Sequence, residues 1–141
     1  MNPVEIGASA LNVEWQRLEI IAENLANMNS ASAVGSDDAY SPQRLISHAA
    51  QSFSQIYGDA RVTRRAFGSQ VANIQVSDNP HTLKFEPDHP LANENGLVQY
   101  PNIDHAYEMT QLMKTSRAYE ANLVSISIIQ QMYSKALQMG G

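Results

Sequence analysis

The chain has 141 residues, of which 43% are hydrophobic and 16% charged, and its formal net charge is -5. This length suits one domain with a modest core, and the acidic balance argues against nucleic-acid binding as the main task. The absence of cysteine excludes disulfides and cysteine-based metal sites.

The N-terminal segment, residues 1–30, is expected to form a helix from about residue 4 to residue 28. Pro3 suits a helix start, and the Asn-rich stretch after residue 26 favours a helix end. An apolar line recurs every seven residues, as in a coiled-coil helix; it consists of Leu11, Leu18 and Leu25. Charged side chains are expected on the opposite, solvated face, namely Glu14, Arg17, Glu19 and Glu23.

The middle of the chain divides into two segments. Segment 31–69 begins as a small, polar, turn-rich loop, and its residues 43–57 allow either a short helix or a strand from Arg44 onward. Its basic residues are interpreted as part of a solvated loop or as salt-bridge donors: Arg61, Arg64 and Arg65. Segment 70–103 shows three short alternating runs separated by Pro- and Asn-containing turns. We expect it to form a small β-rich lobe.

The C-terminal segment, residues 104–141, predicts a second helix of about 50 Å, with Asp104 or Asn102 as its N-cap. Steps of three and four residues define an apolar seam: Met109, Leu112, Tyr119, Leu123, Ile126, Tyr133 and Leu137. A second apolar line lies off this seam and includes Val124, Ile128 and Met132. Because few charges interrupt either line, we expect this helix to have more than one packed face.

The two terminal helices are expected to pack against each other. The predicted fold is therefore mainly α, with a coiled-coil-like pair of N- and C-terminal helices and the β-rich lobe inserted between them. An ordinary helical hairpin core remains an equal alternative on the residues alone. Either arrangement brings the two termini close together.

Catalytic or metal chemistry receives little support. The candidate ligands match no metal-binding spacing: His81, Asp88, His89, Asp104 and His105. There is no serine-hydrolase motif and no glycine-rich phosphate loop. We expect no enzyme activity, cofactor or metal, although a metal-dependent enzyme using His81, His89 and His105 stays an alternative. A membrane-surface helix is disfavoured because the first helix is acidic.

Three stretches carry a family resemblance. Residues 9–30 contain Arg17 and the Asn24-Leu25-Ala26-Asn27 segment, and residues 85–104 end in Pro101-Asn102-Ile103-Asp104. Residues 108–122 contain the segment Ser116-Arg117-Ala118-Tyr119. In this order they resemble the flagellar basal-body rod protein family, most of all its short proximal members. Among these short members, FlgB is similar to the chain at its two ends but matches residues 90–104 less well.

The resemblance implies a structural subunit of the bacterial flagellar proximal rod. Such subunits polymerise helically into the drive shaft that transmits torque to the hook. The implied partners are further copies of the chain, FlgB, FlgF, FlgG, and membrane-ring or export-gate components. The implied place is the basal body in the periplasmic space, reached by flagellar type III export. This route agrees with an N-terminus that has no signal-peptide pattern, and no apolar run approaches the roughly 18 residues of a membrane span.

In such a rod, certain polar and apolar side chains are expected at contacts between subunits: Asn24, Asn27, Asn122, Val124, Ile128 and Met132. The two asparagines of the first helix also suit helix C-capping. A cytosolic helical adaptor or export chaperone is the alternative from another class. Its location in the cell would distinguish it from a rod subunit.

Overall fold

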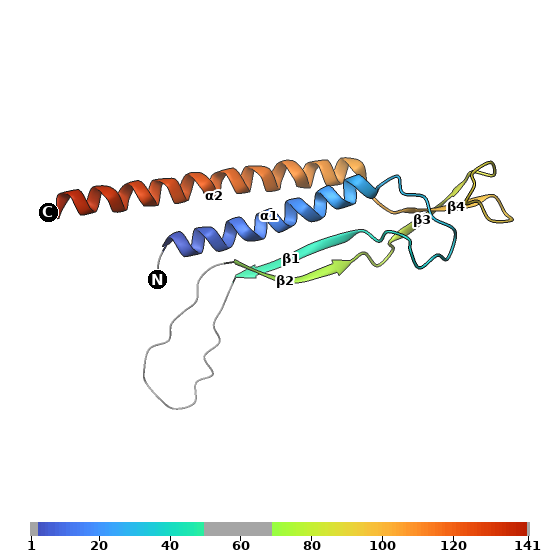
Figure 1. Cartoon of the computed structure of the whole chain (residues 1–141), viewed down its shortest axis with the longest axis horizontal. Coiled ribbons are helices and arrows are strands. Elements are labelled where there is room, and N and C mark those ends of the chain that lie inside the picture. Colours follow the sequence, from blue (N-terminus) through green and yellow to red (C-terminus); the bar gives the residue numbers. More distant parts are fainter. Residues whose placement is uncertain (1–2, 50–68, 141) are drawn as a thin grey trace, which may run out of the picture.

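The computed structural model describes residues 3–49 and 69–140 (Figure 1). Two long helices lie side by side, and two small β-sheets accompany them. The helices are α1 (Pro3–Asn27) and α2 (His105–Met139). Between them come β1 (Gln43–Ala49), β2 (Ser69–Val76), β3 (His81–Phe85) and β4 (Leu97–Pro101). The prediction of a helix pair with a β-rich region between the helices is confirmed.

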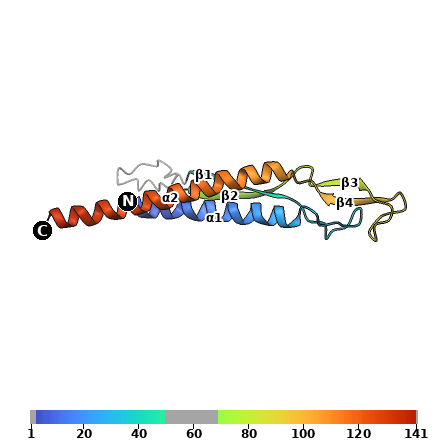
Figure 2. The same cartoon turned by 90° about the horizontal axis from the view of Figure 1, so that it is seen from above.

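The helix pair is antiparallel, and both chain ends lie at the same end of the molecule (Figures 1 and 2). With 25 and 35 residues, α1 and α2 are about 37 Å and 52 Å long. The carboxylate of Asp104 accepts hydrogen bonds from the backbone N–H groups of Ala106 and Tyr107, which confirms the predicted N-cap. The longer helix therefore extends past the shorter one.

The antiparallel sheet β1–β2 packs against α1 on a different side from α2 (Figure 1). Residues 43 to 48 alternate between half-buried and exposed, which is the period of a strand with one covered face. A register shift between Ile46 and Ser47 interrupts the ladder. Of the two possibilities for residues 43–57, the strand is correct up to Ala49. The rest of that segment, and the arginines Arg61, Arg64 and Arg65, lie outside the described residues.

The second sheet, β3–β4, extends beyond the helices at the end opposite the termini (Figure 2). The outer edge of β4 is bridged by Ser32, whose backbone exchanges two hydrogen bonds with Gln99. Gly96 has a positive φ of 71°, and a Cβ at this position would lie 2.9 Å from the Phe85 ring. The three strands expected in segment 70–103 correspond to β2, β3 and β4. They do not share one sheet, because β2 pairs with β1 instead of β3.

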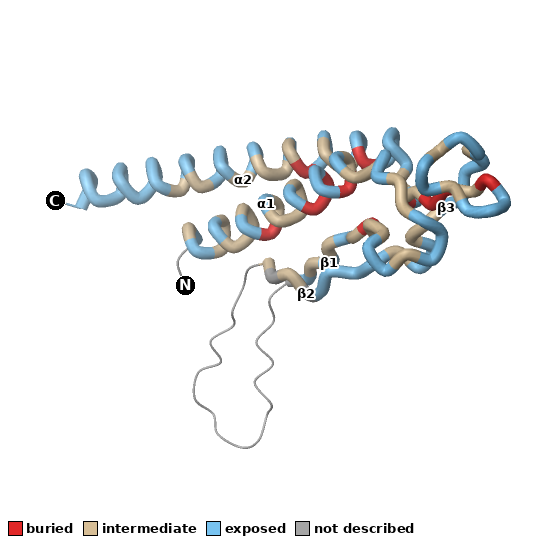
Figure 3. Tube along the Cα trace, turned by 45° about the vertical axis from the view of Figure 1, so that its right-hand side comes forward, coloured by how far each residue is buried: buried red, intermediate tan, exposed pale blue. Residues whose placement is uncertain are grey.

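The core is small and centred on α1. Its apolar members are Val13, Ile20 and Ile21 of α1, with Val98 in the β3–β4 sheet. Figure 3 shows buried residues where the helices overlap, beside β1 and in the β3–β4 region. Within the residues that the structure describes, no helix is both long and apolar enough to span a membrane.

Candidate functional site

The C-terminal part of α2 is uncovered in the isolated chain. Gly7 packs against Ile126, and α1 starts only four residues before Gly7, so α2 passes the end of α1 at about Gln130. Every described residue from Gln130 onward is exposed. Large apolar side chains stay exposed on α2, namely Val124 at 58%, Ile128 at 51%, Met132 at 65% and Leu137 at 78%. Val124, Ile128 and Met132 are spaced four residues apart and form one line along α2, the exposed stripe, whereas Leu137 lies on the seam side. The exposed stripe is a candidate interaction surface.

The predicted seam forms only where both helices are present. A Cβ on Gly7 would lie 2.5 Å from Cγ1 of Ile126, so the two helices approach closely at this point. Farther along, the rings of Trp15 and Tyr119 lie 6.2 Å apart at 49°. Other predicted seam residues are half-buried: Leu11, Leu18, Leu25 and Leu112.

Four predicted seam positions are exposed: Met109, Leu123, Tyr133 and Leu137. For Tyr133 and Leu137 the reason is the length of α1, which ends its overlap with α2 before these residues. The heptad pattern of α2 therefore continues beyond the partner that the chain itself supplies. Leu123 is 45% exposed and Met109 36%, so both lie at the margin of the seam.

Asn24 links four parts of the fold. Its Nδ2 donates to the Gln43 carbonyl at 2.9 Å and to Oε1 of Glu108 at 3.4 Å. Its Oδ1 accepts from the Gln43 N–H at 3.1 Å and from the Tyr40 hydroxyl at 2.8 Å. Because only 1% of Asn24 is exposed, it cannot serve the expected subunit contact; its contacts lie within the chain. One amide thus joins α1, the loop after it, β1 and α2.

The other expected contact residues lie differently. Asn27 is half-buried, and its Nδ2 donates to the Glu23 carbonyl at 2.9 Å, which supports the capping role at the end of α1. Asn122 is also half-buried. Val124, Ile128 and Met132 are exposed and remain candidates for contact between subunits.

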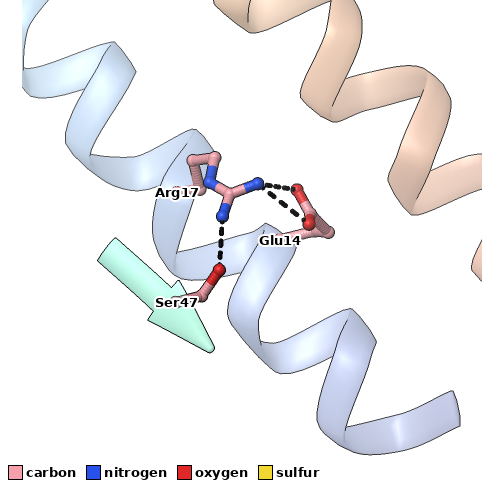
Figure 4. Close-up of polar contacts among 3 residues, drawn as sticks. All are labelled: Glu14, Arg17 and Ser47. Carbon is pink, nitrogen blue, oxygen red and sulfur yellow. Dashed lines mark hydrogen bonds and ion pairs between the residues drawn. The ribbon is translucent and has the colours of Figure 1, made fainter. Parts of the chain in front are cut away.

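Glu14 and Arg17 do not lie on the solvated face where they were expected. Figure 4 shows Arg17 between Glu14 of its own helix and Ser47 of β1. Its Nη1 is 3.0 Å from Oε1 of Glu14, and its Nη2 donates to the Ser47 hydroxyl at 2.8 Å. The predicted spacing of the pair is correct, but the pair fixes β1 against α1. Glu19 and Glu23 are exposed as expected.

Glu108 is the buried charge of the helix pair, at 6% exposure. Burial raises the pKa of its carboxyl group, and Asp104 raises it further, whereas the Asn24 hydrogen bond and the Arg44 charge act to lower it. Arg44 lies 4.8 Å above the ring of Tyr107. Burial, together with the nearby Glu23 and Glu108 carboxylates, also raises the pKa of Tyr40.

Three of the five candidate metal ligands make other contacts. Nε2 of His81 lies 3.2 Å from the Tyr40 carbonyl, and Nδ1 of His89 accepts from the Leu91 N–H at 3.1 Å. Asp104 caps α2. Across residues 3–49 and 69–140, no group of three His, Asp or Glu side chains is placed to hold a metal ion.

A groove of about 290 Å³ lies at the start of α2. It lies between β1 and α2, and its lining includes Arg44, Asp104, Tyr107 and Glu108. Asp104 is used as the helix cap and Arg44 is stacked on Tyr107. The polar groups of this groove therefore serve the joint between β1 and α2.

Two features were missed by reasoning from the sequence. The close approach at Gly7 has one weak signal, since a glycine inside a helical pattern indicates a packing reason. The contacts of Asn24 with Tyr40 and Gln43 have no signal in the sequence, because they depend on where the loop after α1 lies against that helix.

Two family descriptions match the helical ends of this fold. "Flagella basal body rod protein" matches residues 5–31, which include α1 from Glu5 onward. "Flagellar basal body rod FlgEFG protein C-terminal" matches residues 94–139, which include β4 and α2. The matched segments are those that form the antiparallel pair.

Whole-length relatives agree with these matches. The chain is similar to flagellar basal-body rod protein FlgC of Salmonella typhimurium, at 36% identity over 140 residues, 99% of this chain and 97% of the relative. It is similar to FlgC of Bacillus subtilis at 32% identity over 143 residues, 97% of this chain and 95% of the relative. FlgC of Borreliella burgdorferi is 29% identical over 145 residues. The chain therefore belongs to the FlgC family of flagellar basal-body rod proteins and is a structural subunit of the rod.

Proposed function

We propose that the chain polymerises helically into the proximal rod, the part of the drive shaft that carries torque toward the hook. The observation that carries this proposal is the uncovered length of α2, whose apolar side chains have no partner helix within the described chain. Further subunits supply that partner. A contact that repeats head to tail without closing produces a filament.

The proposed partners are other copies of this chain and the rod subunits FlgB, FlgF and FlgG, together with membrane-ring or export-gate components at the base. Torque transmission depends on stiffness and on many contacts, and it requires no catalysis or cofactor. Asn27, Asn122, Val124, Ile128 and Met132 are the residues we propose at these contacts. Asn24 is omitted because it is buried.

The proposed location is the basal body within the periplasmic space, reached by type III export without cleavage of a signal peptide. The alternative is a helical adaptor or export chaperone that stays in the cytosol. Nothing in the exposed stripe of α2 favours that alternative over a rod subunit.

Purification of basal bodies from cells that produce the tagged chain tests the proposal. We expect the chain in the detergent-resistant basal-body fraction, with an uncleaved N-terminus by mass spectrometry. A chain confined to the cytosol would contradict the proposed location. A chain that lacks an N-terminal segment in the basal body would contradict export without cleavage. A cytosolic enzyme serves as the control for contamination.

A further inference from the structure

The outward faces of the two helices carry opposite charges. On α1, Glu5 and Glu23 are exposed and lie eighteen residues apart, which is about five full turns, so they lie on one line. Glu19 lies close to that line and is exposed. Among the described residues of α1 the only basic side chain is Arg17, which is paired with Glu14. The outward face of α1 is therefore acidic.

The outward face of α2 is basic and apolar. Arg117 and Lys135 each lie nine residues from Ile126, about two and a half turns, and thus on the side opposite the contact with α1. Both are exposed, and Val124 and Ile128 lie between them on the same side. Across the described residues the single ion pair is Glu14–Arg17, so neither cation has an acidic partner within 4 Å.

The two faces also match in spacing. Glu5 and Glu23 are eighteen residues apart, and so are Arg117 and Lys135, which gives about 27 Å in both cases. Since the faces point away from each other, one chain cannot bring them together. A second copy with the same orientation can lay its α2 antiparallel along the α1 of the first.

We propose that neighbouring copies of this chain contact each other through these faces, with Glu5 opposite Lys135 and Glu23 opposite Arg117. This inference rests on the proposed polymerisation and assigns its surface. Within one chain Gly7 is level with Ile126, and hence Glu5 with about residue 128. In the proposed contact Glu5 is level with residue 135 of the neighbouring copy instead. The neighbour is therefore shifted by seven residues, about 10 Å along the helix axis, relative to the first copy.

The contact is heterologous, because the acidic face of one copy meets the basic face of the next. It leaves an unused face of each kind at the ends, so the contact repeats and does not close into a dimer. It also covers Val124 and Ile128, which are the exposed apolar residues of that line. Opposite charges select the partner and its register, and the covering of Val124 and Ile128 adds apolar burial to the contact.

Charge reversal tests the pairing in cells. Arg117→Glu with Lys135→Glu, and separately Glu5→Lys with Glu23→Lys, should each remove the chain from basal bodies and abolish swimming. The fourfold variant restores complementarity and should restore both. Glu120→Lys, an exposed reversal off this line, is the control and should swim. Normal assembly of either double variant, or failure of the fourfold variant to recover, overturns the inference.

Crosslinking gives an independent readout, because the chain has no cysteine. With Glu23→Cys and Arg117→Cys, a short thiol crosslinker applied to basal bodies should yield a ladder of dimers, trimers and longer species. Glu23→Cys with Ser127→Cys is the matched control and should stay monomeric, because Ser127 is exposed and lies ten residues, about 15 Å, along α2 from Arg117. Dimers alone would indicate a closed two-fold contact, and no ladder would indicate another surface. Absence of the wild-type chain from basal bodies would instead refute the proposed function.

Discussion

The amide Nδ2 of Asn24 in α1 lies 3.4 Å from the Glu108 carboxylate in α2, 84 residues further along the chain. The same amide is bonded to the backbone of Gln43 and to the Tyr40 hydroxyl. This arrangement fixes the register of α1 against α2 and β1 with one side chain. Because all of its partners are within the chain, the monomer needs Asn24 before any assembly takes place.

Replacing Asn24 should therefore destabilise the isolated chain. Asn24→Ala leaves the Gln43 N–H and carbonyl and the Tyr40 hydroxyl without their partner, which costs about 3 kcal/mol in the free energy of unfolding. Asn27→Ala is the matched control, since among the described residues the Asn27 side chain bonds only to Glu23 and Ser30, at the end of α1. Urea unfolding of both variants measures the difference. Equal stability of the two variants would show that Asn24 does not fix the register.

The buried Glu108 should make stability depend on pH. Because burial raises the pKa of its carboxyl group, the folded chain holds this proton more tightly than the unfolded chain does. Its contribution is then complete below the unfolded pKa of about 4.3 and is lost as pH rises through the higher folded pKa. Glu108→Gln keeps an oxygen acceptor for Asn24 and removes this titration.

Urea unfolding of the wild type and Glu108→Gln between about pH 4 and pH 7 tests this sign. The wild type should lose stability relative to the variant as pH rises. A constant difference would mean that the attraction of Arg44 and the Asn24 hydrogen bond offset the burial of the carboxylate, and a gain by the wild type would mean that they outweigh it.

Gly7 should be intolerant of a side chain because of Ile126. In the wild type, Gly7→Ala places a Cβ 2.5 Å from Cγ1 of Ile126, and overpacking of about 1–3 kcal/mol opposes the gain of about 1 kcal/mol in helix propensity. We expect net destabilisation. In an Ile126→Ala background the clash is absent, so the same substitution should stabilise. The same sign in both backgrounds, measured by thermal unfolding, would refute the close approach.

The exposed stripe of α2 should matter for assembly and not for the monomer. Val124→Asp with Ile128→Asp alters two side chains that are more than half exposed, so the free energy of unfolding should change by about 0.5 kcal/mol or less for each. Swimming in soft agar should be lost because charges then lie in a contact between subunits. Ser127→Asp, an exposed neighbour on α2, is the control. Normal swimming of the double variant would show that Val124 and Ile128 do not contact neighbouring subunits.

Reasoning from the sequence predicted the features that depend on local patterns. The helix ends near Asn27 and Asp104 follow from residue preferences, and the pairing of the helices follows from the sevenfold repeats. The β1 strand stayed ambiguous because Leu45 and Ile46 suit both periods. Long-range contacts, such as those of Asn24 and Arg17 with β1, depend on tertiary placement that no local pattern encodes.

The part of the predicted α2 seam that has no partner in α1 is informative about assembly. Tyr133 and Leu137 continue the heptad pattern although α1 does not reach them. A pattern that outlasts its partner within the chain indicates a partner outside it. The extra length of α2 is thus the feature of the fold that relates most directly to assembly.

The most direct test of the central claim is an electron cryomicroscopy map of the assembled basal body with this chain traced in it. We predict that the chain lies in the proximal rod and that Val124, Ile128 and Met132 contact neighbouring subunits. A rod map without this chain, or one in which these three side chains face solvent, would contradict the account.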